Sequence, residues 1–327
     1  MNPLSALYAA ISGSRNLLYD SGLFSGRLQG PAISVGSLSA GGAGKTPFLI
    51  LLGELLQSRG VAFDVLSRGY GRRSRGVRLV DPAGTAEELG DEPLYISRRL
   101  PVPVIVGEDR YQAGEFAEHK FGPRIHLLDD AFQHRSLARD FEIVLLPFGD
   151  TEDRLFPMGR LREPLASLRR ADAVVIFDEL SARHVPEDKM IWRVRRGIRI
   201  GAAPPGQVAF CGIARPWNFF RDLHDAGLEP AAELAFPDHH CYSDKDIRNL
   251  LRTREQKRVE GFVTTEKDAV NLGPCPASLQ PLWTVGVRME MDQAEAQLDA
   301  MLATIAHRRA GRHETIGENF KLTSGRK

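Results

Sequence analysis

The sequence predicts an α/β protein in which a doubly wound, mostly parallel sheet is followed by a second, smaller α/β domain. From residue 30 onward, short apolar runs alternate with segments of helical periodicity, which is typical of βαβ units. A glycine-rich turn follows the first apolar run, and a Gly/Pro-rich break near residues 198–206 separates two alternating regions. The length of 327 residues agrees with two domains.

The first domain is expected to span residues 31–200. Ala32–Val35 is predicted as its first strand, and Thr46–Ser58 as a helix that Gly60 closes. Helices between successive strands imply parallel pairing. Further apolar runs are short and bounded, which suits strands buried on both faces of a sheet; they are Val61–Leu66, Val104–Val106, Ile125–Leu128, Ile143–Leu146 and Ala173–Phe177.

The second domain is expected over residues 201–306, where the alternation resumes after the break. The polar, glycine-containing residues 307–327 are expected to form a frayed tail. The elements predicted for this domain are strands at Val208–Cys211, Gly261–Thr264 and Leu282–Val287, and helices at Trp217–Ala226, Asp244–Thr253 and Met291–Ala306.

Residues 1–30 carry apolar side chains at helical spacing, among them Leu4, Leu7, Tyr8 and Ile11. No run approaches the ~20 apolar residues that a membrane-spanning helix needs. The segment also lacks the cationic start, long apolar core and cleavage site of a signal peptide. Two interpretations stay open: a helix packed on the protein's own core, or an interfacial helix lying in a membrane surface.

The composition excludes several classes of protein. With 43% hydrophobic and 26% charged residues, the chain is not a disordered, collagen-like or coiled-coil protein. Its net charge of +1 provides no global field for gripping nucleic acid, although a local patch remains possible. Cys211, Cys241 and Cys275 stand far apart without a C-x-x-C pair, so a reducing cytosol is the default expectation.

The strongest motif is the Gly-rich turn at residues 36–46, which a predicted strand enters and a predicted helix leaves. Small residues allow backbone N–H groups to turn toward phosphate oxygens, and the helix N-terminus adds a favourable dipole. Lys45 can reach the β- and γ-phosphates, and Thr46 can offer its hydroxyl to Mg²⁺. Ser39 departs from the usual pattern, which has glycine at that position. The turn predicts a fold of the P-loop NTPase type, with nucleotide bound by Ser39, Ala40, Gly41, Gly42, Ala43, Gly44, Lys45 and Thr46.

A partner for Mg²⁺ should come from an acidic residue at the end of another strand. Asp129 and Asp130 follow the apolar run Ile125–Leu128 directly. Such a pair is more often a turn or a helix cap when it stands alone, but beside a phosphate loop it favours a metal site. The sequence leaves open which of the two carboxylates is the direct ligand.

Other segments carry reactive groups. Ser67–Arg75 follows the second strand and holds four Arg and two Gly, which suit either an anion clamp or a solvated basic loop. Gly90–Pro93 offers two carboxylates at a predicted helix start. Phe236–Tyr242 gathers Asp, two His and Cys, but no second cluster supplies the spacing of a zinc site, so a catalytic or a plain loop histidine is favoured. When the N-K-x-D pattern of guanine recognition is aligned on Asp268, Thr265 and Glu266 stand where its Asn and Lys should be, which argues against a GTPase switch.

Taken together, these motifs resemble the tetraacyldisaccharide 4′-kinase family of Gram-negative bacteria. The likeness runs from about residue 4 to residue 290. Departures are mild: Ser37 replaces the frequent Asn, Ala43 the common Thr, and Ala131 the usual Gly. The motifs that carry the resemblance, in order, are Gly41–Pro47, Ser67–Arg72, Gly90–Pro93, Asp129–His134, Gly159–Pro164, Phe210–Pro216, Phe236–Tyr242 and Thr265–Val270.

The resemblance implies transfer of the ATP γ-phosphoryl group to the 4′-hydroxyl of a tetraacylated glucosamine disaccharide 1-phosphate, giving lipid IV A. It also implies two domains that close around ATP, and an N-terminal helix at the cytoplasmic face of the inner membrane. The site residues that it implies are Lys45 on the phosphates, Asp91 as general base oriented by His239, and Thr46, Asp129, Asp130 and Glu163 around Mg²⁺.

The lipid A disaccharide 1-phosphate would be the acceptor, and no nucleic acid or obligate protein partner is expected. Residues expected to bind this acceptor are Arg68, Tyr70, Arg72, Gln133 and His134. Three rival functions stay open: a nucleotide-dependent switch or metal-delivery NTPase, a soluble small-molecule kinase of the same fold, and a nucleic-acid ATPase. The near-zero net charge weakens the last of these.

Overall fold

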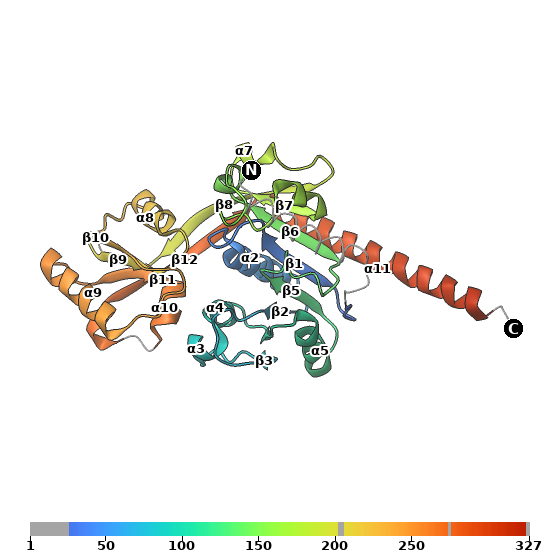
Figure 1. The fold of residues 1–327 in the computed structure, drawn as a ribbon, viewed down its shortest axis with the longest axis horizontal. Helices are drawn as coiled ribbons and strands as arrows, with labels where there is room; N and C mark the ends of the chain where they lie inside the picture. Colours follow the sequence, from blue (N-terminus) through green and yellow to red (C-terminus); the bar gives the residue numbers. More distant parts are fainter. Residues whose placement is uncertain (1–25, 202–205, 274–275, 325–327) are drawn as a thin grey trace.

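The structure, a computed structural model, describes residues 26–201, 206–273 and 276–324, with side chains as far as residue 312. A mostly parallel sheet carries helices on both faces and continues into a smaller α/β unit (Figure 1). The predicted fold class is therefore confirmed.

The first domain begins with a strand that enters the Gly-rich turn and a helix that leaves it. Its strands are β1 (Ala32–Ser37), β2 (Phe63–Ser67), β3 (Arg78–Leu79), β4 (Val104–Val106), β5 (Ile125–Asp129), β6 (Phe141–Leu146) and β7 (Ala173–Ile176). Its helices are α2 (Lys45–Ser58), α3 (Ala86–Leu89), α4 (Asp91–Arg99), α5 (Arg110–Phe121), α6 (Phe148–Thr151), the 3₁₀ helix η1 (Leu165–Arg170) and α7 (Glu179–Ala182).

The central strand β1 lies between β5 and β6 and pairs in parallel with both. Its side chains alternate between the two faces of the sheet. Ile33 and Val35 pack in one core with residues of α2 and α4, whereas Ala32 packs in a second core with Ala113 and Ala117 of α5. Because both faces are covered, every residue of β1 is buried, as the continuous apolar character of these strands predicts.

The smaller domain is joined to the first by two long strands, β8 (Met190–Ile200) and β12 (Leu282–Met291), which the sequence analysis missed or shortened. The start of β8 pairs with β7, and its second half pairs antiparallel with β12, so one sheet runs through both units. The remaining elements are β9 (Val208–Cys211), α8 (Pro216–Asp225), β10 (Ala232–Ala235), α9 (Asp244–Lys257), β11 (Phe262–Thr265), α10 (Glu266–Leu272) and η2 (Ala277–Leu279).

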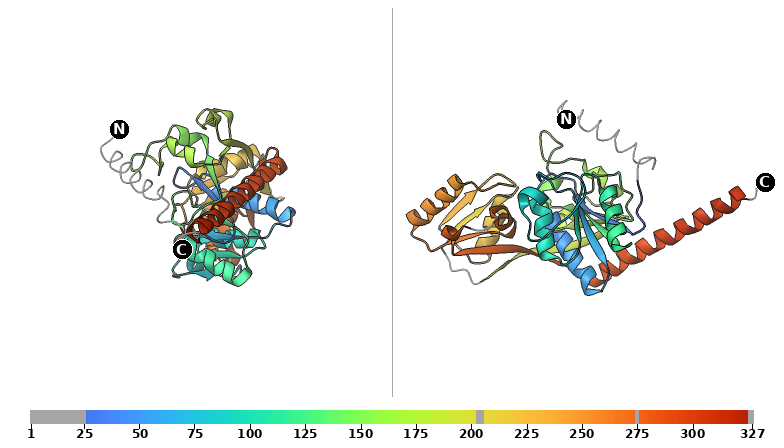
Figure 2. Two further views of the ribbon diagram at one scale, coloured as in Figure 1. Left: turned by 90° about the vertical axis from the view of Figure 1, so that its right-hand side faces the viewer. Right: turned by 90° about the horizontal axis from the view of Figure 1, so that it is seen from below.

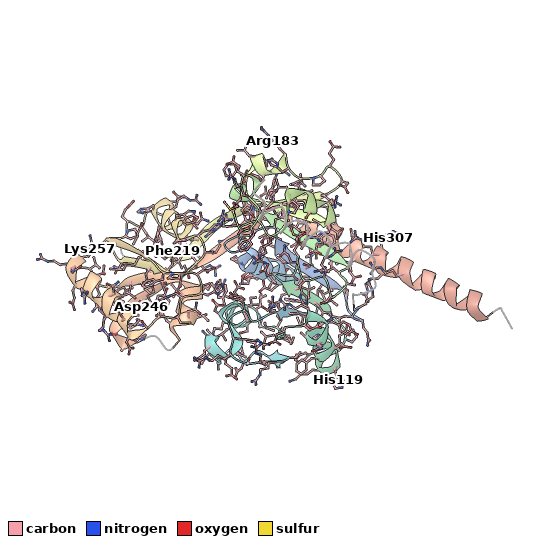
Figure 3. All side chains as sticks on the ribbon, in the orientation of Figure 1. His119, Arg183, Phe219, Asp246, Lys257 and His307 are labelled. Atoms are coloured by element: carbon pink, nitrogen blue, oxygen red, sulfur yellow. The ribbon has the colours of Figure 1, made fainter. Side chains whose placement is uncertain are left out.

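The last helix, α11 (Ala294–Ser324), differs from the sequence-based expectation in length and in place. It returns to the first domain, where Leu298 and Met301 are fully buried in the core that also contains α2. It then projects away from the smaller domain (Figures 1 and 2). The expected frayed tail from residue 307 is wrong at its start, because Arg308 pairs with Asp172 at 2.6 Å. Figure 3 labels His307, close to where the helix leaves the body of the domain.

The proposed N-terminal helix lies mostly outside the described residues, which begin at Gly26. Gly26 and Leu28 already belong to the fold: Gly26 forms an isolated bridge with Leu137, and Leu28 is 4% exposed in the core under α5. Within residues 26–201, 206–273 and 276–324, none of the helices combines the length and apolar character needed to cross a bilayer.

Trp192 anchors β8 to the first domain, and replacing it should destabilise the folded protein. The side chain is fully buried, with its ring centroid 6.2 Å from Phe48 and 6.0 Å from Phe141. We expect Trp192→Ala to lower the free energy of unfolding by about 3–5 kcal/mol, because a large cavity remains. Urea denaturation followed by circular dichroism measures this. Arg193→Ala, at the exposed neighbouring position, should leave the midpoint unchanged, and equal midpoints for both variants would contradict the anchoring role.

Candidate active site

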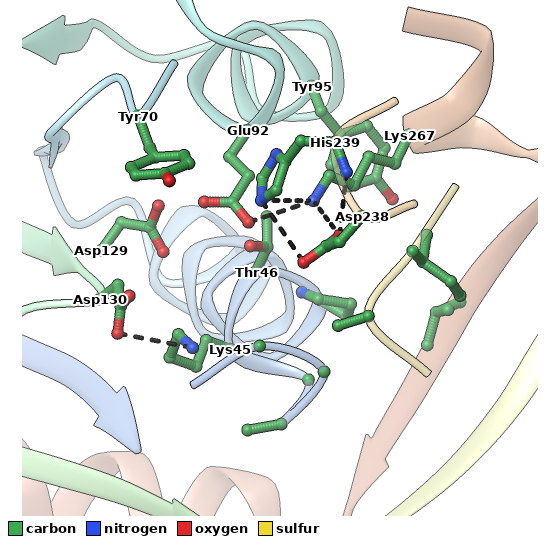
Figure 4. A pocket seen from close by; sticks show the side chains of 18 of the residues that line it. Lys45, Thr46, Tyr70, Glu92, Tyr95, Asp129, Asp130, Asp238, His239 and Lys267 are labelled. Carbon is green, nitrogen blue, oxygen red and sulfur yellow. Dashed lines mark hydrogen bonds and ion pairs between the residues drawn. The ribbon is translucent and has the colours of Figure 1, made fainter. Parts of the chain in front are cut away.

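A cavity of about 780 Å³ lies between the two domains, beyond the C-terminal ends of β1, β2 and β5. In open α/β sheets this edge is where ligands bind, because the loops that leave neighbouring strands diverge there. The first domain contributes the loop after β1, the loop after β2 and residues of α4. The smaller domain contributes residues 213–215, 238–239 and 265–267, and β12 closes one side (Figure 4).

The loop between β1 and α2 has the geometry that phosphate binding requires. Gly41, Gly42 and Gly44 have φ angles of 64°, 70° and 84°, a backbone region that favours glycine. A Cβ atom on Gly41 would lie 2.8 Å from the Cβ of Ala214 in the smaller domain. None of the side chains that the structure describes caps the first turn of α2, so its N–H groups and its dipole can serve an anion.

Lys45 opens α2 and lines the cavity beside Asp130. Its Nζ lies 3.4 Å from the Oδ1 of Asp130, and Arg162 Nη1 lies 3.1 Å from the Oδ2 of the same carboxylate. Burial alone would raise the pKa of Asp130, but these two cations hold it below its ordinary value. Asp130 is therefore an ionised partner that keeps the ammonium group at the cavity wall.

Asp129 ends β5 and is 2% exposed. Burial, reinforced by the nearby carboxylates of Glu92 and Asp130, raises the pKa of Asp129 to about 7. Ser67 donates to its Oδ2 at 3.2 Å, whereas its Oδ1 is buried without a hydrogen-bond partner among the described residues. A buried carboxylate oxygen without a hydrogen-bond donor fits a divalent cation such as Mg²⁺, which prefers oxygen ligands.

Thr46, the other expected ligand, lines the same cavity as Asp129. Over the part of the chain that the structure describes, no group of three or more His, Cys, Asp and Glu side chains could hold a metal ion unaided. A cation at Asp129 would therefore need further oxygens from the nucleotide, as is usual for Mg²⁺ in phosphate sites.

Asp91 and His239 meet across the two domains. Asp91 begins α4 and is 6% exposed, and its Oδ2 accepts a hydrogen bond from His239 Nδ1 at 2.7 Å. Asn271 Nδ2 donates to the same oxygen at 3.2 Å. Although burial would raise the pKa of Asp91, these donors and the charge of Lys267 lower it to about 2. His239 lines the cavity and Asp91 stands behind it, so the histidine is the member that faces a ligand.

Lys267 joins this pair from α10. Its Nζ lies 3.4 Å from Glu92 Oε1, 3.6 Å from Asp91 Oδ2 and 3.4 Å from His239 Nε2 (Figure 4). Burial alone would lower the pKa of Lys267, but the surrounding carboxylates raise it overall, so the ammonium form persists. The cluster therefore ties α10 of the smaller domain to α4 of the first.

Of the five residues expected to bind the lipid acceptor, all but Arg72 line the cavity. Arg68, Tyr70, Gln133 and His134 line the cavity, and the Tyr70 ring lies 5.5 Å from that of His239. Burial, with Arg110 and Arg139 nearby, lowers the pKa of His134 to about 4, so its imidazole is neutral at pH 7. This set supplies one cation and several neutral polar groups to one wall.

Besides Asp91, which stands behind His239, three sequence-predicted residues do not reach the cavity. Glu163 is 2% exposed, and both its oxygens accept from Arg170 at 2.9 and 2.8 Å, so it is not placed as a metal ligand. Arg72 has a side chain only 3% exposed and pairs with Glu108 at 2.9 Å, so it braces its own loop. The hydroxyl of Ser39 donates to Asp150 rather than facing the nucleotide side. In each case another side chain of the fold takes the group, seven residues along the chain for Glu163 and much farther for Arg72 and Ser39.

Two cavity residues were missed by the sequence analysis. Lys267 stands in the Thr265–Val270 segment, which carries part of the family resemblance, but the sequence predicted no role for it in the site. Arg110 opens α5 and lines the cavity, where it donates to the carbonyl of Asp129 at 3.3 Å. Its place just beyond β4, at the same sheet edge as the phosphate loop, was the available signal.

The Asp91–His239 hydrogen bond has a measurable electrostatic consequence. Because the carboxylate stabilises the imidazolium form, the pKa of His239 lies above its ordinary value. Asp91→Asn should lower that pKa, since a neutral amide cannot stabilise the positive charge. Histidine NMR titration from pH 5 to 9 measures it, with His119 on the far side of α5 as an internal control. An unchanged pKa for His239 would contradict the pairing.

Comparisons with known proteins identify the family of this chain. A family model described as tetraacyldisaccharide-1-P 4′-kinase matches residues 1–306. A protein of Koribacter versatilis named tetraacyldisaccharide 4′-kinase is 49% identical over 324 residues, covering 94% of this chain and 99% of the relative. Its namesake from Aquifex aeolicus is 38% identical, covering 83% of this chain and 88% of the relative.

Among solved structures, one described as the "apo" form of LpxK from Aquifex aeolicus in complex with ATP superimposes with a TM-score of 0.76. The two sequences are 34% identical, and the match covers 93% of this chain and 97% of the other. The sequence matches and the shared fold thus indicate the same family. This chain belongs to the tetraacyldisaccharide 4′-kinase family and is a kinase.

Proposed function

We propose that this protein transfers the γ-phosphoryl group of ATP to the 4′-hydroxyl of tetraacyldisaccharide 1-phosphate, giving lipid IV A for lipid A biosynthesis. The observation that carries the proposal is one cavity that is lined both by the phosphate loop and by His239 of the Asp91–His239 pair. Phosphoryl transfer requires a phosphate cradle and a proton acceptor that face the same reacting group.

The phosphate loop would hold the nucleotide through the backbone of Ala40–Gly44, with Lys45 exchanging Asp130 for a phosphate oxygen. Bound Mg²⁺ would neutralise charge on the phosphates. Thr46 and Asp129 are its proposed ligands. Asp129 is favoured over Asp130 because one of its buried oxygens has no donor within residues 26–201, 206–273 and 276–324, whereas Asp130 is already paired with Lys45 and Arg162.

The Asp91–His239 pair would accept the proton of the sugar hydroxyl as the new P–O bond forms. Because His239 lines the cavity and Asp91 lies behind it, we assign the contact with the hydroxyl to the histidine face of the pair. Asp91 supplies the charge that stabilises the protonated pair. The two residues come from different domains, so the proton-accepting pair forms only when the domains are in contact. This requirement restrains ATP hydrolysis by water.

Arg68 and Arg110 are the proposed contacts for the anionic 1-phosphate of the acceptor. Both line the cavity, and guanidinium groups bind phosphate in a bidentate manner. Burial lowers the pKa of Arg110 to about 10, which still leaves it charged at neutral pH.

The direct test is an assay with γ-labelled ATP, Mg²⁺ and lipid A disaccharide 1-phosphate, analysed by thin-layer chromatography. We expect label in the glycolipid, and ATP preferred to GTP. Label that stays in nucleotide and free phosphate, or that passes to a water-soluble alcohol without lipid, would contradict the proposal.

We also propose that the N-terminal segment holds the enzyme at the cytoplasmic face of the inner membrane. Deleting residues 1–25 should abolish co-sedimentation with liposomes, because few charges flank its apolar residues and the contact would be mainly hydrophobic. The deletion stops before Leu28, which is 4% exposed and needed by the core. Unfolding measured beside the binding assay controls for stability. Undiminished liposome binding by a folded deletion variant would exclude this role.

A further inference from the structure

Arg215 belongs to the smaller domain but lies against the phosphate loop of the first. It directly precedes α8, its side chain is 9% exposed, and it lines the cavity. A Cβ atom on Gly42 would lie 2.7 Å from the Cγ of Arg215 and 3.0 Å from its Nε. Only glycine at position 42 leaves room for this side chain, so the loop and the arginine form one continuous surface.

Asp150 fixes the guanidinium group of Arg215 in this position. Asp150 is fully buried in α6, and its Oδ1 accepts from Arg215 Nη2 at 2.8 Å. Its Oδ2 accepts from the Ser39 hydroxyl at 2.5 Å. A buried carboxylate without such donors would be strongly destabilising. The serine that replaces glycine in the phosphate loop thus connects the loop, through Asp150, to an arginine of the other domain.

One N–H group of Arg215, that of Nε, has no acceptor in the described part of the chain. Nε is buried and lacks a hydrogen-bond partner among the described residues, while Nη2 is used by Asp150. Buried polar groups are nearly always paired, so a donor left open at the wall of a nucleotide cavity indicates that a ligand supplies the acceptor. Phosphate oxygens are the acceptors that guanidinium groups bind best.

We propose that Arg215 donates its Nε–H to a phosphate oxygen of the bound nucleotide. The smaller domain then completes the phosphate site that the loop of the first domain begins, and the arginine adds positive charge where phosphoryl transfer develops negative charge. Because Arg215 arrives with the smaller domain, nucleotide binding and contact between the domains stabilise each other. This inference rests on the proposed function, since it takes ATP as the ligand.

Calorimetric titration of the full-length protein with ATP and ADP, and displacement by adenosine, test the contact. Arg215→Ala should weaken ATP and ADP binding about tenfold or more, whereas adenosine binding should change by less than about twofold. Arg160→Ala is the matched control, since Arg160 pairs with Asp153 at 2.8 Å and does not line the cavity. Equal weakening of all three ligands by Arg215→Ala would overturn the inference.

A double variant distinguishes two roles of Arg215: contacting a phosphate group, or only neutralising the buried charge of Asp150. Asp150→Asn removes the buried charge but keeps an acceptor for Ser39. If Arg215 contacts phosphate, Arg215→Ala/Asp150→Asn should bind ATP as weakly as Arg215→Ala. Recovery to within about twofold of wild type would overturn the inference. Wild-type protein that binds no ATP would refute the proposed function as well, whereas unchanged ATP binding in Arg215→Ala refutes only this contact.

Discussion

Asp91→Asn is expected to lower kcat for phosphoryl transfer by about 10²–10⁴-fold, the range for loss of a positioned acid–base group. The amide keeps the size of the side chain but removes the charge that stabilises a protonated His239, 2.7 Å away. ATP affinity should change little, because Asp91 does not line the cavity. Label transfer to the glycolipid measures kcat, and calorimetry with a non-hydrolysable ATP analogue measures binding.

The Asp91 result needs a control that separates chemistry from helix capping. Asp109→Asn provides it, since Asp109 also sits at a helix start and accepts from Tyr111 N at 2.8 Å, but accepts no hydrogen bond from a histidine among the described residues. His239→Ala should resemble Asp91→Asn, and the double variant should be no slower than the slower single variant, because the two residues act as a unit. Turnover of Asp91→Asn within about threefold of wild type, a barrier change under 1 kcal/mol, would exclude the proposed role.

Lys45→Ala should lower kcat by on the order of 10²–10³-fold, as expected when a cation aimed at developing phosphate charge is lost. Unlike Asp91→Asn, it should also weaken binding of the ATP analogue, because Lys45 lines the cavity beside the phosphate loop. The same two assays measure both effects.

Lys257→Ala is the control for Lys45. Lys257 is exposed at the end of α9, at the outer end of the smaller domain (Figure 3). It should bind and turn over ATP like the wild type. If Lys45→Ala transferred label as fast as Lys257→Ala, the loop after β1 would not be the phosphate site.

Much of the first domain could be read from the sequence because its signals are local. A buried parallel strand is a short apolar run, and a glycine-rich turn between such a run and a helix has one common use. The prediction of a strand at Val104–Val106 matches β4 residue for residue, and β5 ends at the predicted acidic pair. The strand β8 was missed because it is not a continuous apolar run: from Trp192 onward every second position is exposed, and several of its residues are arginines.

The interaction partners of individual charged side chains could not be predicted from the sequence in the same way. Glu163 and Asp129 are both acidic residues near the expected site, yet Glu163 is neutralised by Arg170, and Asp129 keeps an oxygen without a donor. Each outcome depends on which cationic side chain the packing of the fold places within about 4 Å of the carboxylate, since an ion pair is strong only at that range.

The order of residues along the chain determined which chemical groups are present and which sheet edge they share: the phosphate loop after β1, the carboxylates after β5, and helix α4 starting at Asp91. Which groups touch is decided by the tertiary structure: Asp91 meets His239, a pairing that the residues themselves did not indicate and only the family resemblance implied, and the phosphate loop meets Arg215; both pairs lie more than a hundred positions apart. The reason is that strand and turn preferences arise from neighbouring residues, whereas hydrogen bonds and ion pairs act over a few ångströms and depend on how β8 and β12 set one domain against the other.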